Sequence, residues 1–293
     1  MNNKRRDDDM KSVNSAILAL FLIMTAAHIA VASPLETLFG TQKGDGARIP
    51  IIMYHVIEDT PDNIWEITAA ELESDLKYLR DNGFTTVFMQ DIIDYVHQGK
   101  PLPPKPILLT FDDGRSCVIS QVIPALEKYD ARAVIAIIGK ETDHYSKIAE
   151  KSPNSRHPHL TWDQVRSAMD SGRIEIQSHT YDLHGPRGAG RLRGETIDTY
   201  QDRLMADLNQ FNAVLKEQTG QTTNTLVFPL GIFSDCTNAI IAEGGFLASL
   251  TASEGIKTIT AGNPESLFSL PRYNRPPHIS SENFFAKALK KLD

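Results

Sequence analysis

Short apolar runs alternate along this chain with longer stretches in which apolar residues recur three and four positions apart. The first pattern is typical of buried strands, and the second is typical of amphipathic helices. We expect strands at 49–55, 83–88, 105–111, 131–138, 173–177, 225–228 and 246–250, and helices at 68–82, 91–98, 116–129, 161–171, 195–219 and 237–243. Because strands alternate with helices, the pattern predicts a mainly parallel sheet covered by helices, in one domain of α/β barrel size.

Two local signals refine this prediction. Thr68 is an N-cap candidate for the helix that follows it, and Glu71 stands three residues later, as in a capping box. The segment between the strand ending at 138 and the helix starting at 161 is polar, so we expect a loop there.

The N-terminal segment is predicted to lie outside the folded domain. Basic residues at 4–6 precede an apolar run at about 13–32 that ends in Ala-Val-Ala, which is typical of a secretory signal peptide. The run also approaches the ~20 residues that a spanning helix needs. We therefore expect a signal peptide or N-terminal membrane anchor at 1–32, a linker at 33–48, and one folded domain at 49–293. The protein would be exported to the periplasm or the extracellular space, with attachment to the membrane through 13–32 as the open alternative.

Composition narrows the class of protein. The net charge is −7, which is not the balance of a nucleic-acid-binding protein, and 41% of the residues are hydrophobic, enough for a full core. Cys117 and Cys236 are too few for a disulfide scaffold, and they either pair or remain two buried thiols. We expect a monomer.

Side chains that could bind a metal or take part in catalysis lie at the ends of predicted strands. Asp112 and Asp113 end one strand beside Gly114, and His179 and His184 follow another. In parallel sheets the carboxyl ends of strands meet on one face, so these side chains can converge. Two imidazoles and a carboxylate are a common ligand set for catalytic zinc. Taken singly, the motifs are also compatible with an Asp-Gly turn and with two core or surface histidines.

Further strand ends add three candidates. Pro229 and Gly231 would break a strand and expose the Leu230 amide to a bound oxygen, although Pro-x-Gly also occurs in plain turns. Arg272 could orient a carboxylate, although an arginine after a strand is usually exposed. His55 ends the first predicted strand on the same face.

The motifs carry a resemblance to a known family. The stretches 110–114 (TFDDG) and 179–184 (HTYDLH) resemble the first two motifs of the polysaccharide deacetylases, the NodB-homology domains of carbohydrate esterase family four. The stretches 53–55 (MYH) and 229–231 (PLG) are similar to motifs of the branch that contains poly-β-1,6-N-acetylglucosamine N-deacetylases. The resemblance extends over about 49–278.

The resemblance implies a deformed (β/α)7 barrel, a single NodB-type domain, with a divalent metal held by Asp113, His179 and His184. Zinc is the expected metal, and nickel, cobalt and iron accept similar ligands. Asp112 corresponds to the general base of the family. The residues alone do not say which aspartate has which role.

Three departures from the family bear on the predicted roles. Phe228 precedes the third-motif proline, where many relatives have arginine, and the last motif reads Leu-Pro-Arg at 270–272, without the histidine that protonates the leaving amine. We therefore predict His55 as the general acid and Arg272 as the partner of Asp112. Leu230 stands where the branch usually has tyrosine, so only its backbone N–H would stabilise the oxyanion.

The predicted activity is removal of N-acetyl groups from a polysaccharide that contains N-acetylglucosamine, with poly-β-1,6-N-acetylglucosamine of biofilms as the first candidate. Tyr54, Tyr181 and Pro229 are predicted to contact the sugar, although aromatic residues near a barrel rim more often pack in the core. The alternatives are the same chemistry on peptidoglycan, chitin oligomers or O-acetyl esters, and a glycan-binding relative with weak activity.

Overall fold

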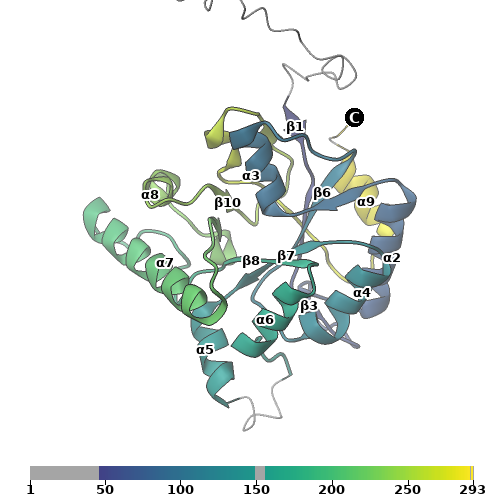
Figure 1. Ribbon diagram of the computed structural model, residues 1–293, viewed down its shortest axis with the longest axis horizontal. Helices are drawn as coiled ribbons and strands as arrows, with labels where there is room; N and C mark the ends of the chain where they lie inside the picture. The colour runs from purple at the N-terminus through teal and green to yellow at the C-terminus, as the bar shows by residue number, and fades with distance from the viewer. Residues whose placement is uncertain (1–45, 149–155, 291, 293) are drawn as a thin grey trace, which may run out of the picture. The chain divides into compact units, whose positions relative to one another are not determined.

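The computed structural model describes residues 46–148, 156–290 and 292 (Figure 1). The predicted signal peptide or anchor lies outside the described residues. Eight strands, all parallel to their neighbours, form the central sheet. In sheet order they are β10 (Ala248–Leu250), β9 (Thr225–Val227), β8 (Ile174–Ser178), β7 (Ala133–Ile137), β6 (Pro106–Phe111), β2 (Ile51–Tyr54) and β12 (Tyr273–Asn274), with β5 (Thr85–Val87) paired to β6.

The two edges of this sheet approach each other through one short segment. Leu270 forms a parallel bridge with Leu250 in β10, and β12, three residues further on, pairs with β2. The sheet therefore curls into a deformed (β/α)7 barrel, which confirms the predicted fold.

Helices surround the curled sheet (Figure 1). They are α2 (Ala69–Asp81), α3 (Met89–Gln98), α4 (Ile123–Lys128) with a π-helical turn before it (Val118–Val122), α5 (Gly139–Ile148), α6 (Trp162–Asp170), α7 (Ile197–Thr219), α8 (Thr237–Glu243) and α9 (Ser281–Leu289). Short 3₁₀ turns lie at Pro229–Gly231 and Pro264–Leu267. The capping box of α2 is confirmed: the Thr68 hydroxyl accepts from the Glu71 amide at 3.1 Å, and the Glu71 carboxylate accepts from the Thr68 amide at 2.8 Å.

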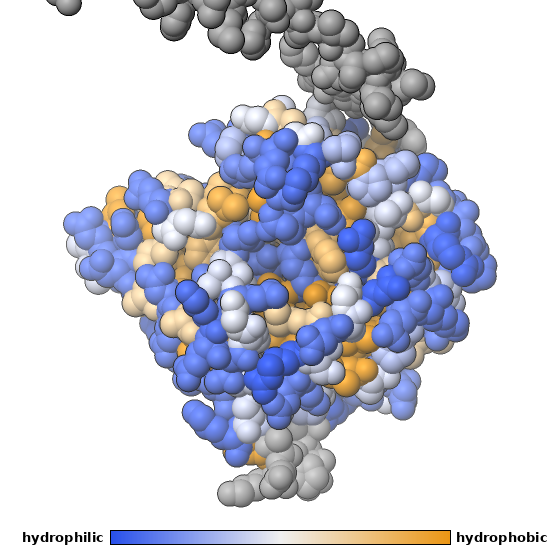
Figure 2. Space-filling view, viewed as in Figure 1, coloured by the Kyte–Doolittle hydropathy of each residue, from blue (hydrophilic) through white to orange (hydrophobic). Residues whose placement is uncertain are grey.

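Apolar residues are buried on both faces of the strands, which explains their continuous hydrophobic runs. Ile52, Leu109 and Ile135 belong to one buried cluster, whereas their sequence neighbours Ile51 and Leu108 belong to another. Hydrophilic residues cover much of the outer surface in the view of Figure 2, with hydrophobic residues showing between them.

The structure contains several elements that the sequence prediction lacks, among them β12 and α9. The predicted polar loop contains helix α5, whose buried residues are only Gly139 and Thr142, so its sequence lacks the apolar periodicity of a helix. The C-terminal end of the predicted linker forms β1 (Ala47–Arg48), which pairs antiparallel with β11 (Thr258–Ile259). A further parallel pair joins β3 (Val56–Ile57) to β4 (Glu66–Ile67).

Cys117 and Cys236, left open by the sequence, are free thiols. In the described part of the chain, no helix is both long and apolar enough to cross a membrane.

Candidate active site

The two aspartates after β6 share one pocket because the backbone leaves the extended conformation there. Consecutive side chains of a regular strand point to opposite faces. Asp113 and Gly114 instead adopt φ of 69° and 68°, which turns the chain sharply after Asp112. A side chain at Gly114 would clash, since a Cβ atom would lie 2.8 Å from Ile137 Cγ2. Glycine is therefore required here both by its positive φ and by the close packing.

Asp113, His179 and His184 form a cluster whose ligand atoms all lie within 4.8 Å of one another. His179 Nε2 is 3.7 Å and His184 Nε2 is 3.2 Å from Asp113 Oδ1. His179 follows β8 directly, and Thr180, with φ of 71°, begins the loop that returns His184 to the same point.

This donor set fits a divalent cation. His179 Nδ1 lies 2.8 Å from the Val227 carbonyl oxygen and would donate to it, which leaves Nε2 as the ligand atom. Burial lowers the pKa of His179, so the ring is neutral, as a ligand must be. The hydrogen bond with Asp113 raises the pKa of His184, an interaction that a bound cation would replace. One carboxylate and two imidazoles leave a coordination position open, as in catalytic zinc sites.

Asp113 is held by residues that the sequence reasoning did not single out. Arg115 donates from Nη2 to Asp113 Oδ2 at 3.1 Å and from Nη1 to the His157 carbonyl oxygen at 2.9 Å. His159 Nδ1 lies 2.8 Å from the Asp113 carbonyl oxygen. Second-layer contacts of this kind fix the orientation of a ligand.

Asp112 forms a buried ion pair with Arg272, as predicted. Arg272 Nη1 and Nη2 lie 2.7 and 2.8 Å from the two oxygens of Asp112, and the two side chains are 1% and 3% exposed. The guanidinium also donates to the Thr251 carbonyl oxygen and the Thr110 hydroxyl. Burial favours the neutral carboxyl, but Arg272 and His179 outweigh it and lower the pKa of Asp112. The carboxylate is therefore charged and fixed in position.

His55 lies at the end of β2 and lines the same pocket. Its ring centroid is 4.7 Å from that of Trp65. Its Nδ1 is buried and has no hydrogen-bond partner among the described residues. Burial lowers the pKa of His55, and the charges of Asp112 and Asp113 oppose this shift only partly. His55 is thus a half-buried imidazole at the pocket, and its Nδ1 finds no partner in the described part of the chain.

The Pro-x-Gly turn places Leu230 at the pocket with φ of 57°. Gly231 and Ile232 donate their amides to the carbonyl oxygens of Phe228 and Pro229, which makes the turn tight. The Leu230 side chain is 56% exposed.

A pocket of about 380 Å³ joins these groups. Seven of the predicted site residues line it: His55, Asp112, Asp113, His179, His184, Leu230 and Arg272. Trp65, Arg115 and His157 also line it, and sequence reasoning missed all three. The proximity of Arg115 to the Asp-Asp-Gly motif was a usable signal, whereas Trp65 and His157 occur in stretches without periodicity.

The three predicted sugar-contacting residues do not line this pocket. Tyr54 is 1% exposed, donates to Asp75 Oδ2 at 3.1 Å and stacks on Phe111, so it belongs to the core and cannot contact a sugar as predicted. Tyr181 donates to Asp143 at 2.7 Å, which raises its pKa to about 12. Pro229 is buried, and its neighbour Leu230 faces the pocket instead.

Residues 99–248, just over half of the chain, match the family described as polysaccharide deacetylase. The chain belongs to this family, and the barrel and the clustered aspartates and histidines agree with that assignment.

Known proteins resemble the chain over most of its length. The Bacillus subtilis (strain 168) protein YxkH, whose name places it among the polysaccharide deacetylases, is 28% identical over 82% of this chain and 76% of its own length. The poly-β-1,6-N-acetyl-D-glucosamine N-deacetylase of Escherichia coli (strain K12) is 26% identical over 81% of this chain, which spans only 38% of that protein. The structure of the BpsB deacetylase domain from Bordetella bronchiseptica is similar with a TM-score of 0.63 and 28% identity, covering 80% of this chain and 97% of that domain.

Proposed function

We propose that this protein is a metal-dependent hydrolase that removes N-acetyl groups from the N-acetylglucosamine residues of a polysaccharide, with poly-β-1,6-N-acetylglucosamine as the first candidate. The observation that carries the proposal is that two groups of side chains line the same pocket. One is the cluster of Asp113, His179 and His184, and the other is the Asp112–Arg272 ion pair. The deacetylases named above supply the substrate class.

Asp113, His179 and His184 would hold the divalent cation. When bound, the cation would act as a Lewis acid that activates water and the acetamide carbonyl. Zinc suits the donor set best, and nickel, cobalt or iron would also accept it.

Asp112 would act as general base and take a proton from the attacking water at a carboxylate oxygen. Arg272 contacts both oxygens of Asp112, so the carboxylate cannot rotate away, and its charge is maintained. Positioning a base in this way contributes typically ~10²- to 10⁴-fold to a rate.

His55 and Leu230 would complete the reaction. The backbone N–H of Leu230 would donate to the oxyanion, and loss of such a donor typically costs about 3 kcal/mol. His55 would give a proton to the leaving amine, in place of the histidine missing from the last motif. Its position in the pocket supports this role.

We infer that the protein acts outside the cytoplasm, because the basic residues at 4–6 and the apolar run at about 13–32 are typical of an exported protein. Cleavage of that segment, attachment to the membrane and the monomeric state remain predictions.

The proposal is tested by acetate release from N-acetylglucosamine oligomers of β-1,6 and β-1,4 linkage and from an O-acetylated sugar. Each reaction is run with and without a chelator. We expect chelator-sensitive release that is fastest with the β-1,6 oligomers. Faster acetate release from another of these compounds would assign that compound as the substrate in place of the β-1,6 polymer. Acetate release that is unaffected by metal removal would overturn the proposed chemistry.

A further inference from the structure

A loop rich in glycine and arginine follows His184 and lies beside the candidate active site. Over 185–194 the sequence reads GPRGAGRLRG, and we call this segment the arginine loop. A Cβ atom at Gly188 would lie 3.0 Å from the Pro229 carbonyl oxygen, so the loop packs directly on the Pro-x-Gly turn. His184, which precedes the loop, and Leu230, which belongs to the turn, both line the pocket. The arginine loop is therefore a neighbour of the pocket on this side.

The backbone of the arginine loop is fixed by contacts with α7. The Ala189 carbonyl oxygen accepts from the Tyr200 hydroxyl at 2.8 Å, and the Gly190 carbonyl oxygen accepts from Arg203 Nη2 at 2.9 Å. The middle of the loop, 188–190, is buried. The place of the loop beside the pocket is thus set by the fold.

The side chains of the loop carry positive charge that the protein does not neutralise. Its three arginines are exposed and form no ion pair or side-chain hydrogen bond within the residues that the structure describes: Arg187, Arg191 and Arg193. The loop contains no acidic residue. Glu195, directly after it, already accepts from Arg203 Nε at 2.8 Å.

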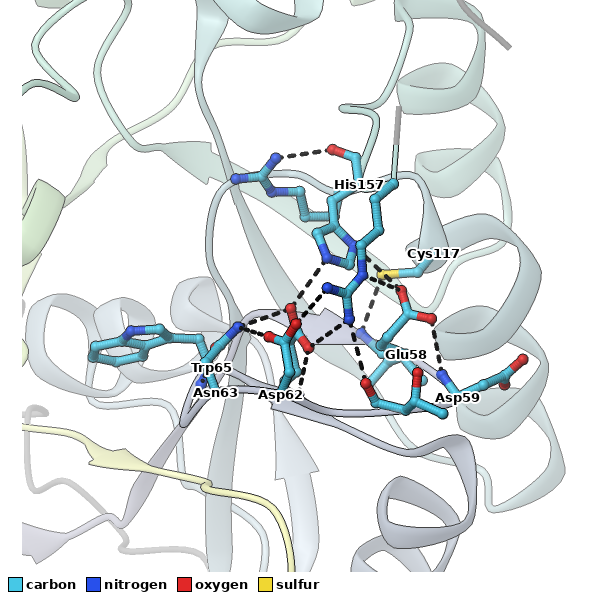
Figure 3. A network of polar contacts seen from close by, with 12 residues as sticks. Glu58, Asp59, Asp62, Asn63, Trp65, Cys117 and His157 are labelled. Carbon is cyan, nitrogen blue, oxygen red and sulfur yellow. Dashed lines mark hydrogen bonds and ion pairs between the residues drawn. The ribbon is translucent and has the colours of Figure 1, made fainter. Parts of the chain in front are cut away.

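Other arginines near the pocket are paired with carboxylates. Arg272 and Arg115 contact the two aspartates of the site. Arg156 belongs to the polar network shown in Figure 3, where it lies 2.5 Å from Asp62 and 3.3 Å from Glu66. The arginine loop differs from these in leaving its guanidinium groups available to a ligand.

The charge of the loop suits an anionic ligand. A single exposed charge is ordinarily only solvated, and it contributes little to binding. Three arginines gathered beside a pocket, in a chain of net charge −7, instead produce a local positive potential that attracts anions. The guanidinium group also matches the two oxygens of a carboxylate with two parallel hydrogen bonds.

We propose that the arginine loop selects polysaccharide chains that carry negatively charged substituents, such as carboxylates, over neutral chains of the same linkage. This inference rests on the proposed function, because it concerns which polymer reaches the same pocket. Since the arginines are exposed, the preference would weaken as the salt concentration rises.

The test is binding of two ligands to the full chain carrying Asp112→Asn, which prevents turnover. One ligand is the β-1,6-linked tetramer of N-acetylglucosamine, and the other is the same tetramer with succinyl half-esters on its hydroxyl groups. By titration calorimetry at low salt, we expect the succinylated tetramer to bind about tenfold more tightly, which corresponds to ~1.4 kcal/mol. At about 0.5 M salt the ratio should fall to about twofold or less.

The decisive variant adds Arg187→Gln, Arg191→Gln and Arg193→Gln, which should reduce the ratio at low salt to about one. Its affinity for the neutral tetramer should not change, which also shows that the pocket is still folded. A loss of affinity for both tetramers alike would overturn the charge preference.

A matched control removes three other exposed cations that form no ion pair in the described part of the chain and do not line the pocket: Arg48→Gln, Lys216→Gln and Lys290→Gln. The control changes the net charge by the same amount and should keep the tenfold ratio. Equal affinity for the two tetramers at low salt, a ratio independent of salt, or an equal loss of the ratio in the control would overturn the proposal.

Acetate release by the unaltered chain is measured separately on both tetramers. Tighter binding of the succinylated tetramer without acetate release from either one would contradict the proposed function and support the role of the arginine loop. Acetate release from both tetramers with equal affinity would support the proposed function and overturn the role of the loop.

Discussion

Two buried aspartate–arginine pairs lie on either side of strand β12, and they differ in what surrounds the carboxylate. Arg272 precedes the strand and binds both oxygens of Asp112. Arg275 follows the strand and binds both oxygens of Asp75 in α2, at 2.8 and 3.2 Å. All four side chains are at most 3% exposed. The same ion pair is therefore built twice within a few residues.

The remaining contacts separate their roles. Asp75 also accepts from the Tyr54 hydroxyl at 3.1 Å and from the Ser281 hydroxyl at 2.6 Å, so protein donors surround it. Asp112 instead faces a pocket with His55 and the histidine cluster. Burial raises the pKa of Asp75 despite Arg275, whereas the surrounding positive groups lower that of Asp112. We infer that the Asp75–Arg275 pair holds β2, α2 and α9 together. The Asp112–Arg272 pair would instead orient the proposed general base.

The largest effect is expected from Asp112→Asn. The amide is similar in shape but cannot take up a proton, so acetate release should fall about 10³-fold or more. The measurement is kcat at saturating substrate, with metal content checked in parallel. Activity within tenfold of the unaltered protein would show that Asp112 is not the base.

Asp75→Asn should lower the stability of the protein much more than its activity. It leaves the buried charge of Arg275 without a counter-charge, so the free energy of unfolding should fall by about 3–5 kcal/mol. Activity of the folded protein should stay within about tenfold, since Asp75 does not line the pocket. Denaturant unfolding and acetate release measured on the same preparation test this. If the Asp75→Asn protein were fully stable but inactive, the Asp75–Arg275 pair would serve activity and not stability, and the proposed difference between the two pairs would be wrong.

If His55 is the general acid, turnover should depend on pH. His55 must then be protonated to act, and burial lowers its pKa below the usual value of about 6.5. The protonated fraction falls as pH rises through this lowered pKa, so kcat should decline with rising pH from below about 6.5. Asp112, Asp113, Arg115 and Arg272 are the charged groups that influence His55.

His55→Ala should remove this decline and lower kcat about 10²-fold at acidic pH. His55→Gln, which keeps a hydrogen-bonding side chain, serves as the control for packing. An unchanged pH profile in His55→Ala would assign the acid to another group.

Leu230→Gly should have the smallest effect and tests whether the turn contributes only its backbone. Leucine at φ of 57° costs roughly 1–2 kcal/mol, which glycine would relieve, partly offset by its greater freedom when unfolded. We expect a gain in stability of up to about 1 kcal/mol and acetate release within about threefold. A loss of tenfold or more would mean that the exposed side chain itself contacts the substrate.

The sequence was most informative where polar residues follow directly on the end of a strand. Asp112 and Asp113 could be placed at a candidate site because an apolar run ends there in two carboxylates and Gly114. The convergence of His179 with them followed from the rule that parallel strands present their carboxyl ends on one face. Arg272 was singled out from the residues as an arginine that could orient a carboxylate, and Asp112 was named as its partner after the motifs were compared with the family; the two side chains form an ion pair.

The remaining features depend on tertiary contacts that no local pattern reveals. Tyr54 and His55 are neighbours in the same motif, yet only the second faces the pocket, because successive side chains at a strand end point in opposite directions. The Asp75–Arg275 pair joins residues 200 positions apart. Helix α5 was hidden because almost none of its side chains is buried.

The most direct test of the central claim is the metal content of the purified protein together with its acetate release, for the unaltered chain and for His179→Ala. If Asp113, His179 and His184 hold one cation, the unaltered chain should contain about one divalent ion per molecule, lose its activity with a chelator and regain it with added metal. His179→Ala should lose both metal and acetate release, by about 10³-fold or more. Full acetate release by His179→Ala, or by the metal-free protein, would contradict the account.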